Sequence, residues 1–68
     1  MNLRIEFEQE EDGRWLAEVV DLPDVLAYGQ TRHEAGAKVQ ALALRVIADR
    51  VEHGEGDLHM INVSFVAA

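Results

Sequence analysis

The chain has 68 residues, of which 13 are acidic, 6 are basic and none is cysteine, and its formal net charge is −7. This length allows one domain with a small core. The lack of cysteine excludes disulfides and thiolate metal sites. No run is apolar enough for a membrane-spanning or signal segment, so a cytoplasmic location is expected. The acidic balance argues against nucleic acid as a direct ligand; it suits a basic partner and equally serves solubility alone.

A β-hairpin is predicted at the start of the chain. Apolar and charged residues alternate over residues 3–8, which is typical of a half-buried strand. The Asp12-Gly13 pair that follows is a turn signal, and residues 15–20 form the second strand of the hairpin. One face of this second strand carries Trp15, Ala17 and Val19.

A short third strand is predicted within residues 25–29. Pro23 separates it from the hairpin, because proline cannot donate a hydrogen bond to a strand ladder. Leu26 and Tyr28 share one face of this strand, since side chains alternate with a period of two.

A helix is predicted from about Arg32 to His53. Thr31 and Glu34 form a capping box, in which the Thr31 hydroxyl accepts from the amide of Glu34 and the Glu34 side chain reaches back to the Thr31 amide. Gly54 is well placed to end the helix.

A final strand is predicted over residues 58–66, where apolar and polar residues alternate again. The resulting order, β-β-β-α-β, indicates a single α+β domain over residues 1–68. We expect an antiparallel three-stranded meander plus one helix and a final strand joining the sheet, in two layers.

The predicted helix has two apolar faces. The face expected to meet the core carries Ala35, Val39, Leu42, Ala43, Val46 and Ile47. A second apolar stripe carries Ala37, Ala41, Leu44, Ala48 and Val51. The narrow charged strip between them allows two i,i+4 ion pairs, Glu34 with Lys38 and Arg45 with Asp49. Because a monomer needs only one apolar helix face, the second stripe is a candidate oligomer interface, although alanines are also common on wet helix faces.

Clustered carboxylates raise the possibility of an enzyme. Glu6 and Glu8 share the outward face of the first strand, and Glu18 is expected across from them. Such a cluster could bind a divalent cation for nuclease chemistry, but a solvated acidic sheet face is the simpler interpretation, because no phosphate-binding loop or basic cluster accompanies it. We therefore expect no catalytic, metal or cofactor site, and interpret Trp15 and Tyr28 as core or interface aromatics.

An ordered set of residues resembles the HicB-like antitoxin family. The set begins with Phe7 and covers most of the chain, to about Gly54. It comprises Phe7, Asp12-Gly13, Trp15, Ala17, Glu18, Val19, Asp21-Leu22-Pro23, Val25, Ala27, Gly29, Thr31 and Glu34-Ala35. Its specificity comes from the combination, since no single dipeptide is characteristic.

The resemblance implies a partial ribonuclease-H-like fold without nuclease activity. Members of this family bind a small mRNA-cleaving toxin of the HicA type, which resembles a double-stranded-RNA-binding domain, and mask its active site. Such a toxin is expected to be basic, and self-association to a dimer or tetramer is also expected. Two departures from the family are noted: no C-terminal DNA-binding module is expected in residues 1–68, and Asp24 follows Pro23 where the family often has glycine.

The leading functional hypothesis is therefore an antitoxin-like protein-binding module. The alternative is an orphan homo-oligomeric regulatory domain without a toxin partner. Aromatic residues often anchor interfaces, and the charge favours a basic partner. The candidate contact residues are Glu6, Glu8, Trp15, Glu18 and Tyr28.

Overall fold

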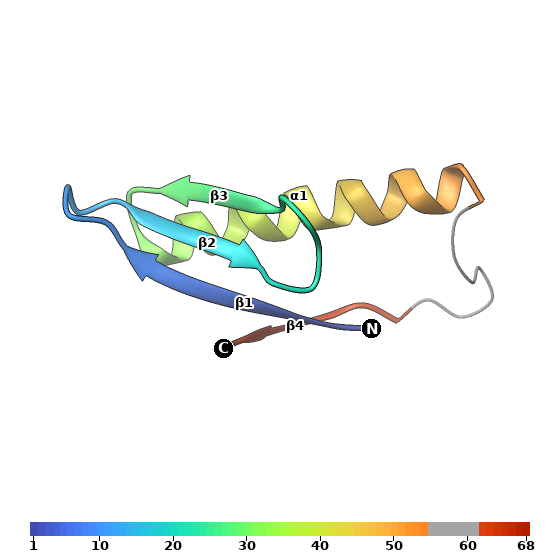
Figure 1. The fold of residues 1–68 in the computed structure, drawn as a ribbon, viewed down its shortest axis with the longest axis horizontal. Helices are drawn as coiled ribbons and strands as arrows, with labels where there is room; N and C mark the ends of the chain where they lie inside the picture. The colour runs from blue at the N-terminus through green and yellow to red at the C-terminus, as the bar shows by residue number, and fades with distance from the viewer. Residues whose placement is uncertain (55–61) are drawn as a thin grey trace.

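The computed structural model of the chain describes residues 1–54 and 62–68. Within them, α1 packs along one face of a sheet, which gives two layers (Figure 1). The elements are β1 (Asn2–Gln9), β2 (Trp15–Val19), β3 (Leu26–Gly29), α1 (Arg32–Glu52) and β4 (Ser64–Ala67). The α+β class and the element order predicted from the sequence are confirmed.

The sheet is mixed, with strand order β3-β2-β1-β4. β1 pairs with β2, and β2 with β3, in antiparallel fashion, whereas β4 lies beside β1 and runs parallel to it. The sequence-based description as an antiparallel meander thus holds for three strands and misses both the strand order in space and the parallel pair. The parallel pair has a simple cause, because α1 returns the chain to the end of the sheet at which β1 begins (Figure 1).

The last strand differs from its predicted range at both described ends. Asn62 and Val63 are not part of β4, which spans Ser64–Ala67. The part of the prediction over 58–61 lies outside the described residues. Val63 and Phe65 are half-buried while Asn62 and Ser64 are exposed, so the expected alternation is correct for the described part.

The start of α1 differs from the expected capping box in one bond. The Thr31 hydroxyl accepts from the Glu34 amide at 3.0 Å, as expected. The Glu34 carboxylate, however, accepts from the amide of Gln30 at 3.2 Å, one residue before the predicted donor. The Gln30 amide, followed by the nearby Lys38 ammonium at 3.2 Å, lowers the pKa of the Glu34 carboxyl. The bonds of Glu34 to Thr31 and to Gln30 tie the strand-to-helix connection to the first helical turn.

The helix ends close to where it was predicted to end. The His53 amide donates to the Asp49 carbonyl at 3.1 Å, and Gly54 adopts φ +72°, a left-handed conformation that glycine tolerates. The second predicted ion pair is wrong in its partner, since the Asp49 carboxylate lies 3.4 Å from the His53 ring and not beside Arg45.

The core lies between α1 and the β2–β3 side of the sheet. Ala17 and Val19 of β2 and Val39 of α1 are fully buried, and the predicted core residues Leu42 and Val46 are only half-buried. Two core residues, Leu22 and Val25, come from the loop between β2 and β3 and were not predicted as core. The buried apolar residues are Leu3, Ile5, Ala17, Val19, Leu22, Val25, Ala35, Val39, Ala43 and Ile47.

Asp21 joins this loop to β1. Its carboxylate accepts from the Arg4 amide at 2.8 Å, and the Arg4 guanidinium lies 3.2 Å from its other oxygen. The Arg4 amide, and then its guanidinium, lower the pKa of the Asp21 carboxyl. Further along the loop, Asp24 has φ +61°, in the left-handed region. This geometry gives a physical reason why glycine suits the position after Pro23.

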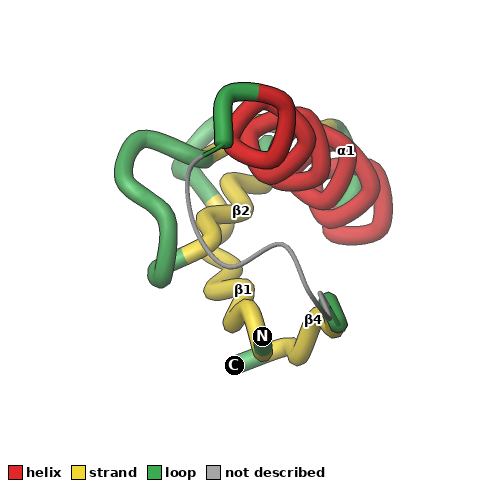
Figure 2. Tube along the Cα trace, turned by 90° about the vertical axis from the view of Figure 1, so that its right-hand side faces the viewer, coloured by secondary structure: helices red, strands yellow, loops and turns green. Residues whose placement is uncertain are grey.

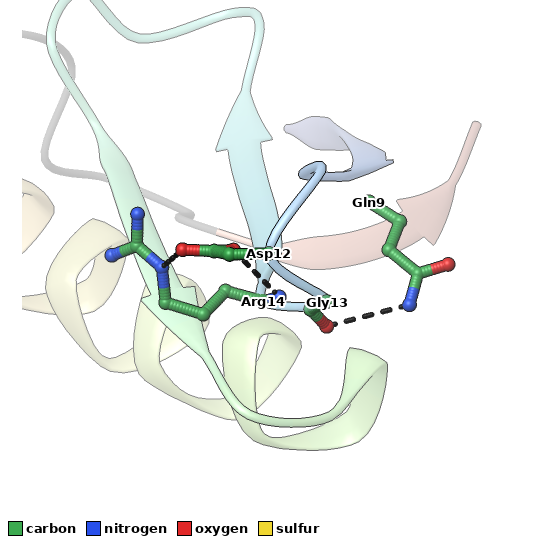
Figure 3. A network of polar contacts seen from close by, with 4 residues as sticks. All are labelled: Gln9, Asp12, Gly13 and Arg14. Atoms are coloured by element: carbon green, nitrogen blue, oxygen red, sulfur yellow. Dashed lines mark hydrogen bonds and ion pairs between the residues drawn. The ribbon is translucent and has the colours of Figure 1, made fainter.

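The hairpin turn is held by side-chain bonds as well as by its backbone (Figure 3). The Asp12 carboxylate accepts from the Arg14 amide at 3.0 Å and from its guanidinium Nε at 2.8 Å. The side-chain Nε2 of Gln9 donates to the Gly13 carbonyl at 3.3 Å, and Gly13 itself has φ +91°. The Asp-Gly turn predicted from the sequence is therefore present and positions Arg14 at the end of the sheet.

Candidate partner-binding surface

The face of the sheet opposite α1 carries two cross-strand rows of side chains. In the first row, Glu6 of β1 is directly opposite Glu18 of β2, which is opposite Leu26 of β3. In the second row, Glu8 is opposite Leu16, which is opposite Tyr28. We call these six residues the outer face. It arises because strand side chains alternate and the other set is needed for the core.

The carboxylates of the outer face are solvent-exposed. Among the described residues, no ion pair joins Glu6, Glu8 or Glu18 to a basic side chain. Glu6 and Glu18 are like charges in direct cross-strand opposition, which is an unfavourable arrangement. A basic partner would relieve this repulsion.

Apolar and aromatic surface lies beside these carboxylates. Leu26 and Tyr28 are each 42% exposed, which is high for such side chains. The guanidinium of Arg14 stands over the Tyr28 ring, 4.8 Å from its centroid. A shallow depression of about 220 Å³ opens between Leu16 and the three glutamates, over Phe7. The outer face thus combines negative charge with large apolar groups, which are the components of a protein interface.

Trp15 lies on the other side of the sheet. It shares the inner face with Ala17 and Val19, is half-buried and packs against the core. The structure therefore brings together four of the five candidate contact residues, Glu6, Glu8, Glu18 and Tyr28, and separates Trp15 from them. The alternation in β2 already placed Trp15 and Glu18 on opposite faces. Leu16 and Leu26 join the surface instead, through the strand register.

The second helix stripe is only partly exposed. Ala37, Leu44 and Ala48 are exposed, whereas Ala41 and Val51 are half-buried and Val51 packs against the chain's own core. Leu44, which is 48% exposed, is the one large side chain of the stripe with substantial exposure.

An apolar groove separates α1 from the β1–β4 side of the sheet. Seen along the sheet in Figure 2, α1 stands over β2, while β1 and β4 lie apart from it. The groove has a volume of about 330 Å³, and its floor includes Phe7 and Phe65. The guanidinium of Arg32 lies 3.9 Å from the Phe7 ring centroid and closes one side. No sequence signal could have revealed this groove, because it depends on the pairing of β4 with β1.

The described carboxylates do not gather into a cluster of the kind that holds a metal ion. Within residues 1–54 and 62–68, no three His, Cys, Asp or Glu side chains come together in an arrangement that could hold a metal ion. In the same part of the chain, no helix has the length and apolarity needed to cross a membrane.

In comparisons with known proteins, the chain matches no family model, no curated protein and no solved structure.

Proposed function

We propose that the chain is an antitoxin-like protein-binding module that neutralises a small basic mRNA-cleaving toxin of the HicA type by covering its active site. The observation that carries this proposal is the outer face, where the glutamates of β1 and β2 lie beside exposed Leu26 and Tyr28 of β3. A toxin that binds RNA needs basic residues for phosphate contacts. Those residues are suitable partners for the glutamates, which form no ion pair within the described part of the chain.

Charge and apolar surface have separate roles in this proposal. The net charge of −7 and the glutamate rows attract a basic partner and accelerate association. Tyr28 and Leu26 supply the apolar area whose burial holds the complex together. Because the same basic residues of the toxin cannot contact RNA and these glutamates together, binding here inhibits cleavage.

The resemblance to HicB-like proteins supports the proposal through particular residues. Three residues of the resembling set have structural roles. Gly29 and Thr31 form the strand-to-helix connection, and Asp21 holds the loop after β2 against Arg4 of β1. A partial ribonuclease-H-like fold, a non-enzymatic role and a cytoplasmic location belong to this proposal, since the target would be a toxin that acts on mRNA. The β-β-β-α-β order and the mixed sheet are compatible with that fold.

A direct test uses the small basic protein encoded by the reading frame next to this chain in its genome. That protein should cleave mRNA, and an equimolar amount of this chain should stop the cleavage. If no such reading frame exists, or if its product is a nuclease that this chain neither binds nor inhibits, the antitoxin proposal is wrong and the orphan regulatory domain is preferred.

The variant Glu18→Lys locates the binding surface. It should weaken toxin binding, measured by titration calorimetry, by about tenfold or more, because it places a cation where a basic partner docks. It should not unfold the chain, since it removes the Glu6–Glu18 repulsion. Glu52→Lys at the far end of α1 changes the net charge equally and is the matched control. Equal losses in both variants would show that net charge alone drives binding.

A further inference from the structure

β4 is an edge strand without the usual protection against pairing. It has β1 on one side and, within the described residues, no strand on the other. Exposed edges are commonly blocked by charged residues, proline or a bulge, but the sequence Ser64-Phe65-Val66-Ala67 contains no charge and no proline. Val66 is 49% exposed on it. The other edge strand, β3, ends at Gly29, which is pressed against the start of α1.

The hydrogen-bond pattern shows which backbone groups of β4 point away from β1. The amides of Ser64 and Ala68 donate to β1, to the carbonyls of Met1 and Ile5 at 2.9 and 2.8 Å. Because backbone groups of successive strand residues point to alternate sides, the N–H and C=O groups of Phe65 and Ala67 point away from β1. This side of β4 therefore presents two donors and two acceptors, which a second copy in antiparallel orientation can match.

Charge favours this edge for contact between two acidic copies. The glutamates of the outer face lie on β1 and β2, and the β1 residue opposite Val66 is Arg4. With β4 strands paired, Glu6 of each copy would be separated by three strand spacings, or about 14 Å. That exceeds the screening length of about 8 Å at physiological salt. Repulsion between the two acidic outer faces is therefore weak in this arrangement.

We propose that two copies of the chain pair through β4, in antiparallel orientation about a two-fold axis at Val66. In this register Phe65 and Ala67 of one copy exchange hydrogen bonds with Ala67 and Phe65 of the other, and the two Val66 side chains face each other. The result is a continuous sheet with four strands from each copy. Its outer face keeps both sets of glutamates accessible, so self-association does not compete with the proposed partner.

The first test replaces Ala67 with proline and measures the mass of the toxin-free chain by sedimentation equilibrium. Wild type should be a dimer, and Ala67→Pro should weaken dimerisation by about tenfold or more, because each copy loses one outward donor. The β4–β1 bonds do not use the Ala67 amide, and proline is tolerated at an edge, so the variant should keep the wild-type circular dichroism spectrum. A monomeric wild type overturns the proposal.

The second test depends on the register and does not require proline. Val66→Lys and Val66→Glu should each weaken the dimer several-fold, because like charges then face each other across the axis. An equimolar mixture of the two should form a heterodimer more tightly than either variant alone. If mixing the two variants does not restore dimerisation, the proposed antiparallel register is wrong.

The variant Leu44→Glu separates the β4 edge from the second helix stripe. Leu44 is exposed on α1 and takes no part in the proposed β4 pairing, so this substitution should leave the dimer intact. If Leu44→Glu yields a monomer while Ala67→Pro does not, the helix stripe is the interface and the β4 proposal is wrong. None of these measurements involves a toxin, so their outcome is independent of the proposed function.

Discussion

Gly29 of β3 and Ala35 of α1 are in direct backbone contact. A β-carbon built on Gly29 would lie 2.5 Å from the backbone nitrogen of Ala35, a distance that side chains do not adopt. The close approach lets the chain pass from strand to helix within a short connection, where Thr31 caps the helix. The junction between β3 and α1 therefore gives a structural reason for three residues of the set that resembles HicB-like proteins: Gly29, Thr31 and Ala35.

Gly29→Ala should destabilise the fold by about 3 kcal/mol, because the helix start must move away from β3 to admit the methyl group. The free energy of unfolding in urea measures this. Gly13→Ala is the matched control, since its β-carbon meets nothing within 4 Å and only its φ of +91° opposes alanine; it should cost about 1 kcal/mol. Equal losses for both would contradict the steric explanation.

Asp24 should tolerate glycine better than alanine. Its φ of +61° suits glycine, whereas alanine in the left-handed region costs about 1 kcal/mol or more. We expect Asp24→Gly to unfold at or slightly above the wild-type temperature and Asp24→Ala below it, in calorimetric scans. The reverse order would show that the loop does not need this backbone conformation.

Acid should destabilise the fold through Asp21. Its pKa is lowered in the fold, mainly by the Arg4 amide and then by the Arg4 guanidinium, so the folded state binds protons less readily than the unfolded state. The stabilisation is present above about pH 4 and is lost as the pH falls through the folded pKa. Asp12 and Glu34 act in the same direction.

The variant Asp21→Asn tests the contribution of Asp21 itself. It should be less stable than wild type at neutral pH, and its unfolding temperature should fall less steeply between about pH 5 and pH 2. Thermal unfolding followed by circular dichroism across this range measures both slopes. Identical slopes would mean that the Asp21–Arg4 contact is not maintained in solution.

The Glu6–Glu18 pair should show a repulsive coupling. Glu6→Gln and Glu18→Gln should each raise the unfolding free energy slightly, and the double variant should gain less than their sum. The difference should be about 0.2–1 kcal/mol and should shrink in high salt. An additive double variant would show that the two carboxylates do not interact.

Salt should affect the two proposed associations in opposite directions. Each copy carries a net charge of −7, so added salt should tighten dimerisation by screening repulsion. Binding of a basic toxin should weaken under the same conditions, because salt screens attraction. Titration calorimetry of the toxin and sedimentation of the chain alone, each at low and high salt, measure the two effects. Toxin binding that is insensitive to salt would argue against the glutamates as its main contacts.

Local patterns in the sequence were sufficient for much of the fold. The two-residue period of β1 and β2, the Asp12-Gly13 turn and the Thr31 cap are short-range features, and each was present close to its predicted place. The same period identified the outward position of Glu6, Glu8 and Glu18. For Tyr28 it predicted only a shared face with Leu26, which the structure shows to be the outer face. Trp15 was assigned to the contact residues by its residue type, although the alternation of side chains along β2 placed it on the inner face.

Only the tertiary structure decided which residues from distant segments meet. The parallel pairing of β4 with β1 and the groove floored by Phe7 and Phe65 join segments that no local pattern relates. Burial of Leu22 and Val25 likewise depends on the loop folding over the core. The sequence by itself determined the elements and the faces of its strands, because propensity, capping and alternation act within a few residues. Strand order and packing depend on the whole chain, because burying its apolar surface selects one arrangement among several that the same elements allow.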